Sequence, residues 1–415
     1  MGTSVLSASV ILDLVSRGGL GAVYQPIVAL DENCVVGWEA LARGPAGSEL
    51  EAPARLFAAA RQEGVERELD RACRRAALEG AAAAGLGPGH SLFLNVEPLT
   101  LDSGGVLDEL GEESHQPALV VELTERALAS RPSDVLAAVR WLRERGCRIA
   151  LDDVGVDRRS LALMPFVAPD VIKLDAALTQ ERMEPVEAAR VVNAVAAEAE
   201  RSGAVVLAEG IETERHLLRA LAMGATLGQG WLFGRPGPLP RGGLPDSGFE
   251  LPSRAAGPES LGTPFERIAD KRRLRRGDKR LLLALSRQLE QEAAAFEGEA
   301  VVISTFQEAR FYTGKTRRHY ERLASGAALV GALGVGLSSD PGRGVRGADI
   351  PTDDNLRGEW DVAVVGPHFA GAFVARDLGD HGADSDRRFD YFTTYDRELA
   401  VDAARTLLRR IVPNA

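Results

Sequence analysis

Side chains that can hold metal ions follow short apolar runs through the first half of the chain. They are Glu39, Asn95, Glu122, Asp152, Asp153, Glu209 and Gln229. A lysine, Lys173, stands between Asp153 and Glu209 in the sequence. A single glutamate after a strand is usually a solvated residue. Several carboxylates, an amide and a lysine at one end of a sheet can instead hold divalent cations beside a phosphate ester. This series therefore points to an enzyme.

The segment that carries these residues, 20–236, alternates between strand-like and helix-like stretches. The expected strands are residues 22–29, 35–41, 92–96, 119–123, 148–151, 171–174, 205–208 and 226–228. Alanine-rich helical stretches are expected at residues 54–80, 133–145 and 186–202. Repeated β–α units predict a mostly parallel sheet wrapped by helices, and about eight strands favour a closed barrel over an open sheet.

Composition excludes several other classes of protein. A chain of 415 residues exceeds the usual size of one domain, so two domains are expected. The net charge of -11 makes DNA binding through bulk charge unlikely. Three cysteines without a CxxC pair argue against a disulfide framework and a structural zinc site. No apolar run reaches the roughly 18 residues of a membrane span, and no basic head marks a signal peptide. A cytoplasmic protein is expected.

The second half of the chain predicts a linker and a smaller α/β domain. Residues 237–264 are dense in proline, glycine and serine, which is typical of a poorly ordered linker. The basic run 271–280 predicts a short helix with a solvated face. Further strands are expected at residues 300–304, 328–334, 360–365 and 371–377, and helices at 281–297, 315–324 and 397–411. Gly314-Lys315-Thr316 predicts a helix start, because Ala309 stands where a phosphate loop needs glycine.

The motifs of residues 20–236 together resemble the EAL-domain phosphodiesterases, which hydrolyse the second messenger cyclic di-GMP to linear pGpG. They stand in family order as Tyr24-Gln25-Pro26-Ile27, Glu39-Ala40-Leu41-Ala42-Arg43, Asn95, Glu122-Leu123-Thr124-Glu125, Asp152-Asp153, Ile172-Lys173-Leu174-Asp175, Ala208-Glu209-Gly210-Ile211-Glu212-Thr213 and Gly228-Gln229-Gly230. The resemblance implies a modified (β/α)8 barrel of the TIM type, with the site at the carboxyl ends of the strands.

The resemblance also implies a site with two metal ions. One ion would be held by Glu39, Asn95, Glu122 and Asp152, and the second by Asp153 with help from Asp152 and Glu209. Such oxygen-rich ligands suit Mg²⁺ or Mn²⁺, whereas zinc prefers histidine and cysteine. Two cations roughly 3.5–4 Å apart can neutralise the charge that develops on a phosphodiester.

Roles in catalysis and substrate binding follow from the same resemblance. The catalytic residues would be Lys173, Glu209 and Glu39. Lys173 would orient the attacking water, and Glu209 is the candidate base. Substrate binding would fall to Gln25, Leu41, Arg43, Asn95 and Gln229, with Gln25 on a guanine edge and Arg43 on a phosphate. Glu212 and Glu125 would support the ligands and the loop after Asp153. From the residues alone, an Asp152-Asp153 pair after an apolar strand is more often a turn, and Tyr24 could equally stack on a base or pack in the core.

One loop departs from the family pattern. Where the family reads DDFGTGYSSL, this chain reads DDVGVDRRSL from Asp152 to Leu161. Asp157 in place of glycine restricts the backbone wherever a positive φ is required, and Glu97 replaces a small hydroxyl residue. No metal ligand is lost, so an active phosphodiesterase is favoured. A catalytically weak or inactive cyclic di-GMP receptor or scaffold stays open as the alternative, and a homodimer stays open too.

Residues 265–415 resemble the DICT domain, a sensory module. The resemblance rests on residues 301–306, on residues 360–369 and on the closing stretch 389–411. It implies that this domain controls the barrel through an unknown ligand or protein partner. The predicted division of the chain is 1–236 for the phosphodiesterase domain, 237–264 for the linker and 265–415 for the sensory domain.

Overall fold

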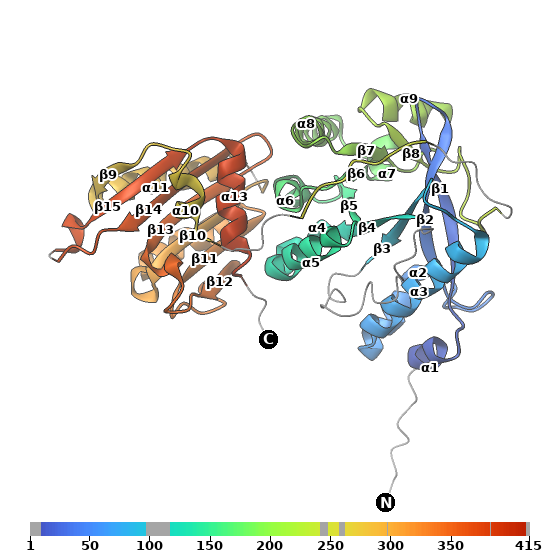
Figure 1. The fold of residues 1–415 in the computed structure, drawn as a ribbon, viewed down its shortest axis with the longest axis horizontal. Coiled ribbons are helices and arrows are strands. Elements are labelled where there is room, and N and C mark those ends of the chain that lie inside the picture. The colour runs from blue at the N-terminus through green and yellow to red at the C-terminus, as the bar shows by residue number, and fades with distance from the viewer. Residues whose placement is uncertain are drawn as a thin grey trace, which may run out of the picture.

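The structure is a computed structural model that describes residues 10–96, 117–240, 248–256, 262–296, 298–381 and 383–411. It contains a closed barrel of eight strands and a separate seven-stranded sheet. Figure 1 shows the two units side by side, with the barrel in blue to green and the second sheet in yellow to red. The expected fold class, a modified barrel followed by a smaller α/β unit, is confirmed. The exact division at residues 237–264 stays a prediction.

The barrel strands follow one another around the ring in sequence order. They are β1 (Gly21–Ala29), β2 (Cys34–Arg43), β3 (Ser91–Asn95), β4 (Ala118–Thr124), β5 (Arg148–Val154), β6 (Val171–Leu174), β7 (Val205–Ala208) and β8 (Leu227–Gln229). Strand β1 is antiparallel to both of its neighbours, while the other pairs are parallel. A hairpin of this kind needs only a short turn, which residues 30–33 supply. The barrel is therefore closed by one reversed strand.

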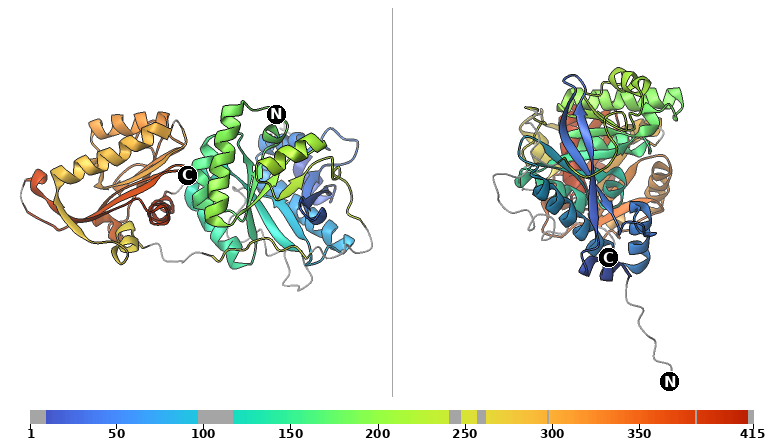
Figure 2. Two further views of the ribbon diagram at one scale, coloured as in Figure 1. Left: turned by 90° about the horizontal axis from the view of Figure 1, so that it is seen from above. Right: turned by 90° about the vertical axis from the view of Figure 1, so that its right-hand side faces the viewer.

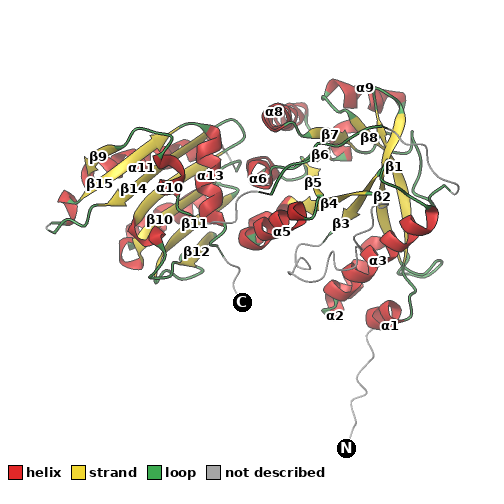
Figure 3. Cartoon of the chain, in the orientation of Figure 1, coloured by secondary structure: helices red, strands yellow, loops and turns green. Residues whose placement is uncertain are grey.

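Helices surround the barrel strands, as the red and yellow ribbons of Figure 3 show. They are α1 (Val10–Ser16), α2 (Pro53–Glu63), α3 (Glu66–Ala84), α4 (Glu125–Ser130), α5 (Pro132–Glu144), α6 (Arg159–Val167), α7 (Ala176–Thr179), α8 (Pro185–Ser202) and α9 (Glu214–Ala222). The single helix expected over residues 54–80 is two helices. Gly64 ends the first of them in a left-handed conformation, with φ +69°, which glycine adopts at little cost.

The end of the barrel opposite the carboxyl ends of its strands is partly covered by the linker. Leu251 is buried against the barrel interior, and Arg148 Nε donates to its carbonyl oxygen at 3.1 Å. Arg254 forms an ion pair with the buried Asp170 at 3.6 Å. The expectation of a poorly ordered linker is therefore wrong for residues 248–256, because Arg148 of the barrel binds the linker backbone and the buried Asp170 holds the linker's Arg254.

The second unit is a mixed sheet in the order β12-β11-β10-β13-β14-β15-β9. Its strands are β9 (Arg275–Asp278), β10 (Val301–Glu308), β11 (Leu329–Val335), β12 (Val345–Asp349), β13 (Glu359–Val365), β14 (Ala370–Asp377) and β15 (Arg388–Thr394). Helices α11 (Lys279–Ala293) and α12 (Gly314–Ser325) cover one face. The other face is covered by α10 (Pro264–Ala269) and α13 (Arg397–Leu408).

The basic run 271–280 does not form the predicted helix. Its middle is the edge strand β9, which pairs antiparallel with β15. Arg276 lies opposite Asp390 in that pairing and forms an ion pair with it at 2.7 Å, an arrangement that favours a strand. Helix α11 starts only at Lys279, where the side chain of Asp278 caps it. By contrast, the helix start predicted at Gly314 is confirmed, with Thr313 as its cap.

The two units share an interface at α6, α8 and α13, visible from above in Figure 2. Arg405 on α13 donates to the carbonyl oxygens of Pro165 and Phe166 on α6, at 2.6 and 3.2 Å. Arg190 on α8 meets Glu299 of the second unit at 3.4 Å. The apolar residues Leu163, Phe166 and Leu407 belong to one buried cluster. This contact places the second unit against the helix that follows the Val154–Arg159 loop.

Candidate active site

Lys173 lies at the centre of a ring of carboxylates inside the barrel. Its Nζ is 2.7 Å from Glu122, 2.8 Å from Glu209 and 2.9 Å from Asp152, and Glu39 lies at 3.8 Å. The four carboxylates come from β2, β4, β5 and the residue after β7. Parallel strands bring their carboxyl ends to the same edge of the barrel, which is why residues so distant in sequence meet here.

Amide side chains complete one side of this ring. Asn95 Nδ2 donates to one oxygen of Glu39 at 2.9 Å, and Gln229 Nε2 donates to the other at 2.6 Å. Gln229 also reaches Gln25 Oε1 at 3.2 Å. Both oxygens of Glu39 are thus held in fixed directions. The structure brings Gln25, Asn95 and Gln229 to the carboxylates, as the sequence predicts, although their roles stay predictions.

The charge of this ring is not balanced, since one ammonium faces four carboxylates. Burial alone would lower the pKa of Lys173, but Glu122, Glu209, Glu39 and Asp152 together raise this pKa well above its usual value. Burial raises the pKa of Glu122 well above the usual range, and Glu39 adds to that effect. Burial also raises the pKa of Glu209 to about 8, despite the nearby Lys173. The site therefore favours uptake of positive charge, either protons or metal ions.

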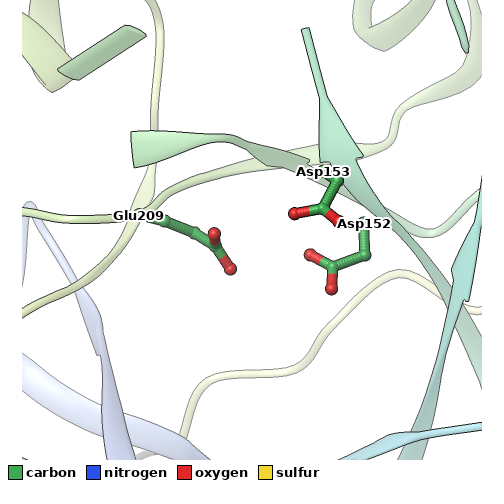
Figure 4. Close-up of side chains that lie close together, drawn as sticks. All are labelled: Asp152, Asp153 and Glu209. Carbon is green, nitrogen blue, oxygen red and sulfur yellow. The ribbon is translucent and has the colours of Figure 1, made fainter. Parts of the chain in front are cut away.

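Oxygen atoms in this ring are arranged as metal ligands would be. Carboxylate oxygens of Asp152, Asp153 and Glu209 lie within 4.8 Å of one another, and Figure 4 shows Glu209 facing the two aspartates across a shared space. The buried Glu122 Oε2 has no hydrogen-bond partner among the described residues. A buried carboxylate oxygen left without a donor is costly, and a bound cation would satisfy it. The donor set therefore fits hard divalent cations.

Asp153, near the end of β5, has an unusual backbone conformation. Its φ is +57°, a left-handed value that is uncommon outside glycine but tolerated by aspartate. Gly155 follows with φ +110°, and a Cβ there would lie 3.0 Å from Leu178. Asp157 has no positive φ, and its side chain accepts from the backbone N–H of Arg159 at 2.9 Å. The substitution of glycine by Asp157 thus imposes no left-handed strain here.

Two residues that the sequence did not single out hold Glu209 in place. Thr179 Oγ1 donates to the Glu209 carbonyl at 2.5 Å, and Gln180 Nε2 donates to the Gly210 carbonyl at 2.8 Å. Gln180 also reaches Glu212 Oε1 at 3.3 Å, so Glu212 lies in the supporting layer rather than in the ring. The one sequence signal near them is Asp175, in the Lys173 motif, whose side chain caps the short helix α7 that contains Thr179.

A cavity of about 360 Å³ adjoins the ring on the side of β2 and β3, lined in part by Glu39, Leu41, Asn95 and Glu122. Its wall includes a buried ion pair between Asp70 and Arg74 on α3, another feature that the sequence did not reveal. Leu41 lines this cavity, and its role in substrate binding stays a prediction.

The remaining predicted residues fall outside the ring. Arg43 is half-buried at the end of β2, where its guanidinium donates to the Ala42 carbonyl. The Glu125 side chain and Glu97 lie outside the described part of the chain. Tyr24, left open by the sequence, is a core residue whose hydroxyl donates to the Ala77 carbonyl at 2.7 Å.

Comparison with known families matches both units of the chain. Residues 9–236, more than half of the chain, match the EAL domain family. Residues 267–378 match DICT, described as a sensory domain in diguanylate cyclases and two-component systems. Among the described residues, no helix has the length and apolar character needed to cross a membrane.

Individual relatives share the barrel part of the chain. The cyclic di-GMP phosphodiesterase RocR of Pseudomonas aeruginosa is 30% identical over 229 residues, which cover 54% of this chain and 58% of RocR. An uncharacterised Mycobacterium tuberculosis protein is 31% identical over 242 residues, covering 54% of this chain and 77% of that protein. The chain thus matches less than two thirds of the length of RocR.

Solved structures also align with the barrel. The manganese and cyclic di-GMP complex of BlrP1 from Klebsiella pneumoniae aligns at 28% identity and TM-score 0.47, covering 53% of this chain and 56% of that one. The PaMucR phosphodiesterase in complex with cyclic di-GMP aligns at 24% identity and TM-score 0.48, covering 55% of this chain and 96% of that one.

Proposed function

The chain belongs to the EAL domain family, and we propose that its barrel hydrolyses cyclic di-GMP to linear pGpG with Mg²⁺ or Mn²⁺. The observation that carries this proposal is the ring of Glu39, Glu122, Asp152 and Glu209 around Lys173. Its excess negative charge is unsuited to an anionic substrate on its own and well suited to metal ions that bind a phosphodiester. RocR, a similar protein over the same segment, is named a cyclic di-GMP phosphodiesterase.

The residues of this chain would divide the reaction among them. Metal ions would be held by Glu39, Asn95, Glu122, Asp152, Asp153 and Glu209, and they would supply Lewis-acid stabilisation of the phosphate charge. Glu209 accepts the proton of the attacking water as the general base. Lys173 orients that water and offsets the charge on the phosphorus centre. The bond from phosphorus to the leaving O3′ breaks, and pGpG results.

A second candidate function is a cyclic di-GMP receptor with little or no turnover. It is favoured by the altered loop after Asp153, where Asp157, Arg158 and Arg159 stand in the sequence. The described ring nevertheless retains its carboxylates and its lysine, so the enzyme is the better supported candidate.

Product formation separates the two functions. The purified chain is incubated with cyclic di-GMP and Mg²⁺ or Mn²⁺, and nucleotides are separated by chromatography. We expect pGpG to accumulate with metal and to disappear after chelation. A Glu39→Gln variant should lose this activity, while Glu32→Gln, an exposed glutamate in the β1–β2 turn, should retain it. Tight cyclic di-GMP binding by the wild-type chain without any pGpG would favour the receptor.

Control of the barrel by the second unit is the further part of this proposal. Helix α6 follows the short loop after β5, the strand that carries Asp153, and Arg405 of α13 binds the carboxyl end of α6. A movement of α13 would therefore act on the helix next to a predicted metal ligand. Removal of residues 265–415 should change the rate of hydrolysis if this coupling exists, and an unchanged rate under every tested input would contradict it.

A further inference from the structure

The second unit contains a cavity of about 400 Å³ between α11, α12 and the sheet. This volume lies within the range of small-molecule sites. Its walls carry the aromatic rings of Phe306, Phe311, Trp360 and Phe389, together with those of Tyr320 and His319. Such rings favour a flat ligand, because they offer apolar faces and edges for stacking.

The interior polar groups of this cavity are already paired within the protein. The buried Glu290 accepts from the Tyr320 hydroxyl at 2.5 Å, and its other oxygen lies 2.8 Å from His319 Nε2. Burial raises the pKa of Tyr320 well above its usual value, so the hydroxyl stays a donor to Glu290. The carboxylate of Glu290 is thus engaged, and it leaves the aromatic walls as the main surface for a ligand.

The mouth of the cavity is basic. Lys279 is neutralised by Asp384, at 2.5 Å. The side chains of Arg287, Lys315 and Arg322 also line the cavity, and none of the three forms an ion pair with a described residue. Three unopposed cations are unexpected in a chain with a net charge of -11. They favour a ligand with a negative group that remains near the mouth.

The backbone beside the cavity is also irregular. Gln307, which lines it, has φ +58° at a register shift between β10 and β11. Its side chain accepts from Arg387 at 3.0 Å. Left-handed conformations of such residues are strained and cluster at ligand sites. The bulge turns β10 at the point where it borders the cavity.

From these features we propose that the cavity binds a small aromatic anion, with one or two rings between Phe306 and Trp360 and a carboxylate or phosphate at Lys315 and Arg322. Nothing in the proposed barrel chemistry requires this site. Binding therefore stands independently of cyclic di-GMP hydrolysis.

Helix α12 borders two cavities, and the barrel contributes residues to the second of them. Lys315 and Arg322 border the ligand cavity, while Ala324, at the end of the same helix, borders a second cavity of about 580 Å³. Asp157 and Arg159 of the barrel line that second cavity too. A ligand that shifts α12 would thus act beside the loop that follows β5, the strand that carries Asp153. This consequence rests on the proposed phosphodiesterase function, whereas the binding site does not.

Calorimetric titration of the full chain without divalent ions tests the binding site. The probes are indole-3-acetate and phenyl phosphate, each paired with a neutral counterpart, indole-3-acetamide and phenol. We expect the anions to bind at least roughly tenfold more tightly than the neutral compounds, because each charge-assisted contact is lost with the charge. Lys315→Gln combined with Arg322→Gln should remove this preference. Both side chains are exposed, so folding should persist.

Arg318→Gln is the matched control, because Arg318 is exposed on the same helix and does not line the cavity. It should bind the anions as the wild type does. Failure of both anions to bind, equal binding of the neutral compounds, or an unchanged preference in the double variant would overturn the site. Binding that leaves cyclic di-GMP hydrolysis unchanged would support the site and contradict its coupling to the barrel.

Discussion

At the scale of single residues, Lys173 decides the electrostatics of the barrel interior. It is 1% exposed and faces four carboxylates. A buried lysine without partners would be costly, so its position in an apolar strand predicts the acidic surroundings from sequence alone. Thr179 and Gln180, which hold the backbone at Glu209, could not be predicted in this way. Their hydrogen bonds depend on how two loops meet in space.

Replacement of Lys173 tests this balance. Lys173→Ala should abolish cyclic di-GMP hydrolysis and should lower the melting temperature of the metal-free protein, because the buried carboxylates lose their cation. Removal of one partner from a buried charge cluster typically costs about 3–5 kcal/mol. Added Mn²⁺ should recover part of the melting temperature but not the activity. Lys271→Ala, at an exposed lysine, is the control. A metal-free variant as stable as the wild type would contradict the account of the ring.

The pKa shifts of the ring predict how pH and metal ions act together. The pKa of Glu209 rises to about 8 and that of Glu122 rises as well, so the metal-free folded protein holds protons that the unfolded chain releases near its ordinary glutamate pKa. The stabilisation from these bound protons is fully present below the pKa of the glutamates in the unfolded chain. It is lost as the pH rises through their pKa in the folded protein. Metal ions compete with these protons and bind better as the protons leave.

Thermal unfolding with and without Mn²⁺ measures this competition. The rise in melting temperature on adding Mn²⁺ should be larger at about pH 8.5 than at about pH 6.5. These two pH values lie on either side of the range in which a glutamate with a raised pKa titrates. Glu122→Gln should reduce the rise at both pH values. An equal rise at both pH values in the wild type would show that the carboxylates bind metal without releasing protons.

At the scale of elements, the strands that carry the site were predictable and the special conformations were not. Apolar runs that end in Glu122 or Asp152 mark β4 and β5, since parallel strands buried on both faces are apolar throughout. The strand β9 was missed because Arg275 and Arg276 look like a solvated face. Its pairing with β15 depends on residues more than a hundred positions away. The left-handed Asp153 likewise follows from its surroundings and not from its own sequence.

Gly210 forms the turn directly after Glu209 and so affects the position of that residue. Its φ is +68°, and a Cβ there would lie 2.5 Å from the Ala176 Cβ. Gly210→Ala should therefore lower stability by more than the roughly 1 kcal/mol of the backbone term alone and should also reduce hydrolysis, because the Glu209 loop must shift.

Gly203→Ala is the control for the backbone term. Gly203 has φ +71° with nothing within 4 Å of an added Cβ, so it incurs the conformational cost without the clash. Urea unfolding and initial rates measure both effects. Equal losses of stability in the two variants, with activity retained in Gly210→Ala, would remove the proposed role of this turn.

At the scale of the whole molecule, the sequence indicated two α/β units but not how they meet. The interface depends on Arg405, whose side chain reaches two carbonyl oxygens of α6, and on apolar residues such as Phe166 and Leu407. Each of these residues also fits an ordinary amphipathic helix, so no local pattern distinguishes an interface from a core. The mode of contact needed the assembled structure.

Loss of Arg405 should weaken this interface. Arg405→Met removes two hydrogen bonds to α6 while keeping much of the apolar stem, and hydrogen bonds to charged groups contribute about 1.5–3 kcal/mol each. Limited proteolysis should then cut the linker faster than in the wild type. Arg357→Met, whose partner Thr352 lies within the second unit, should leave the cleavage rate unchanged. Equal cleavage in all three proteins would show that Arg405 does not hold the units together.

Hydrolysis of cyclic di-GMP by the barrel is tested by a single-turnover measurement with the purified chain in excess over the substrate. Excess protein reveals even slow chemistry, because every substrate molecule is bound and product release no longer limits the signal. We predict that pGpG forms with Mg²⁺ or Mn²⁺ present, and that neither the chelated protein nor Lys173→Ala produces it. Complete binding of cyclic di-GMP by the metal-loaded wild type, with no pGpG at any time, would contradict the account.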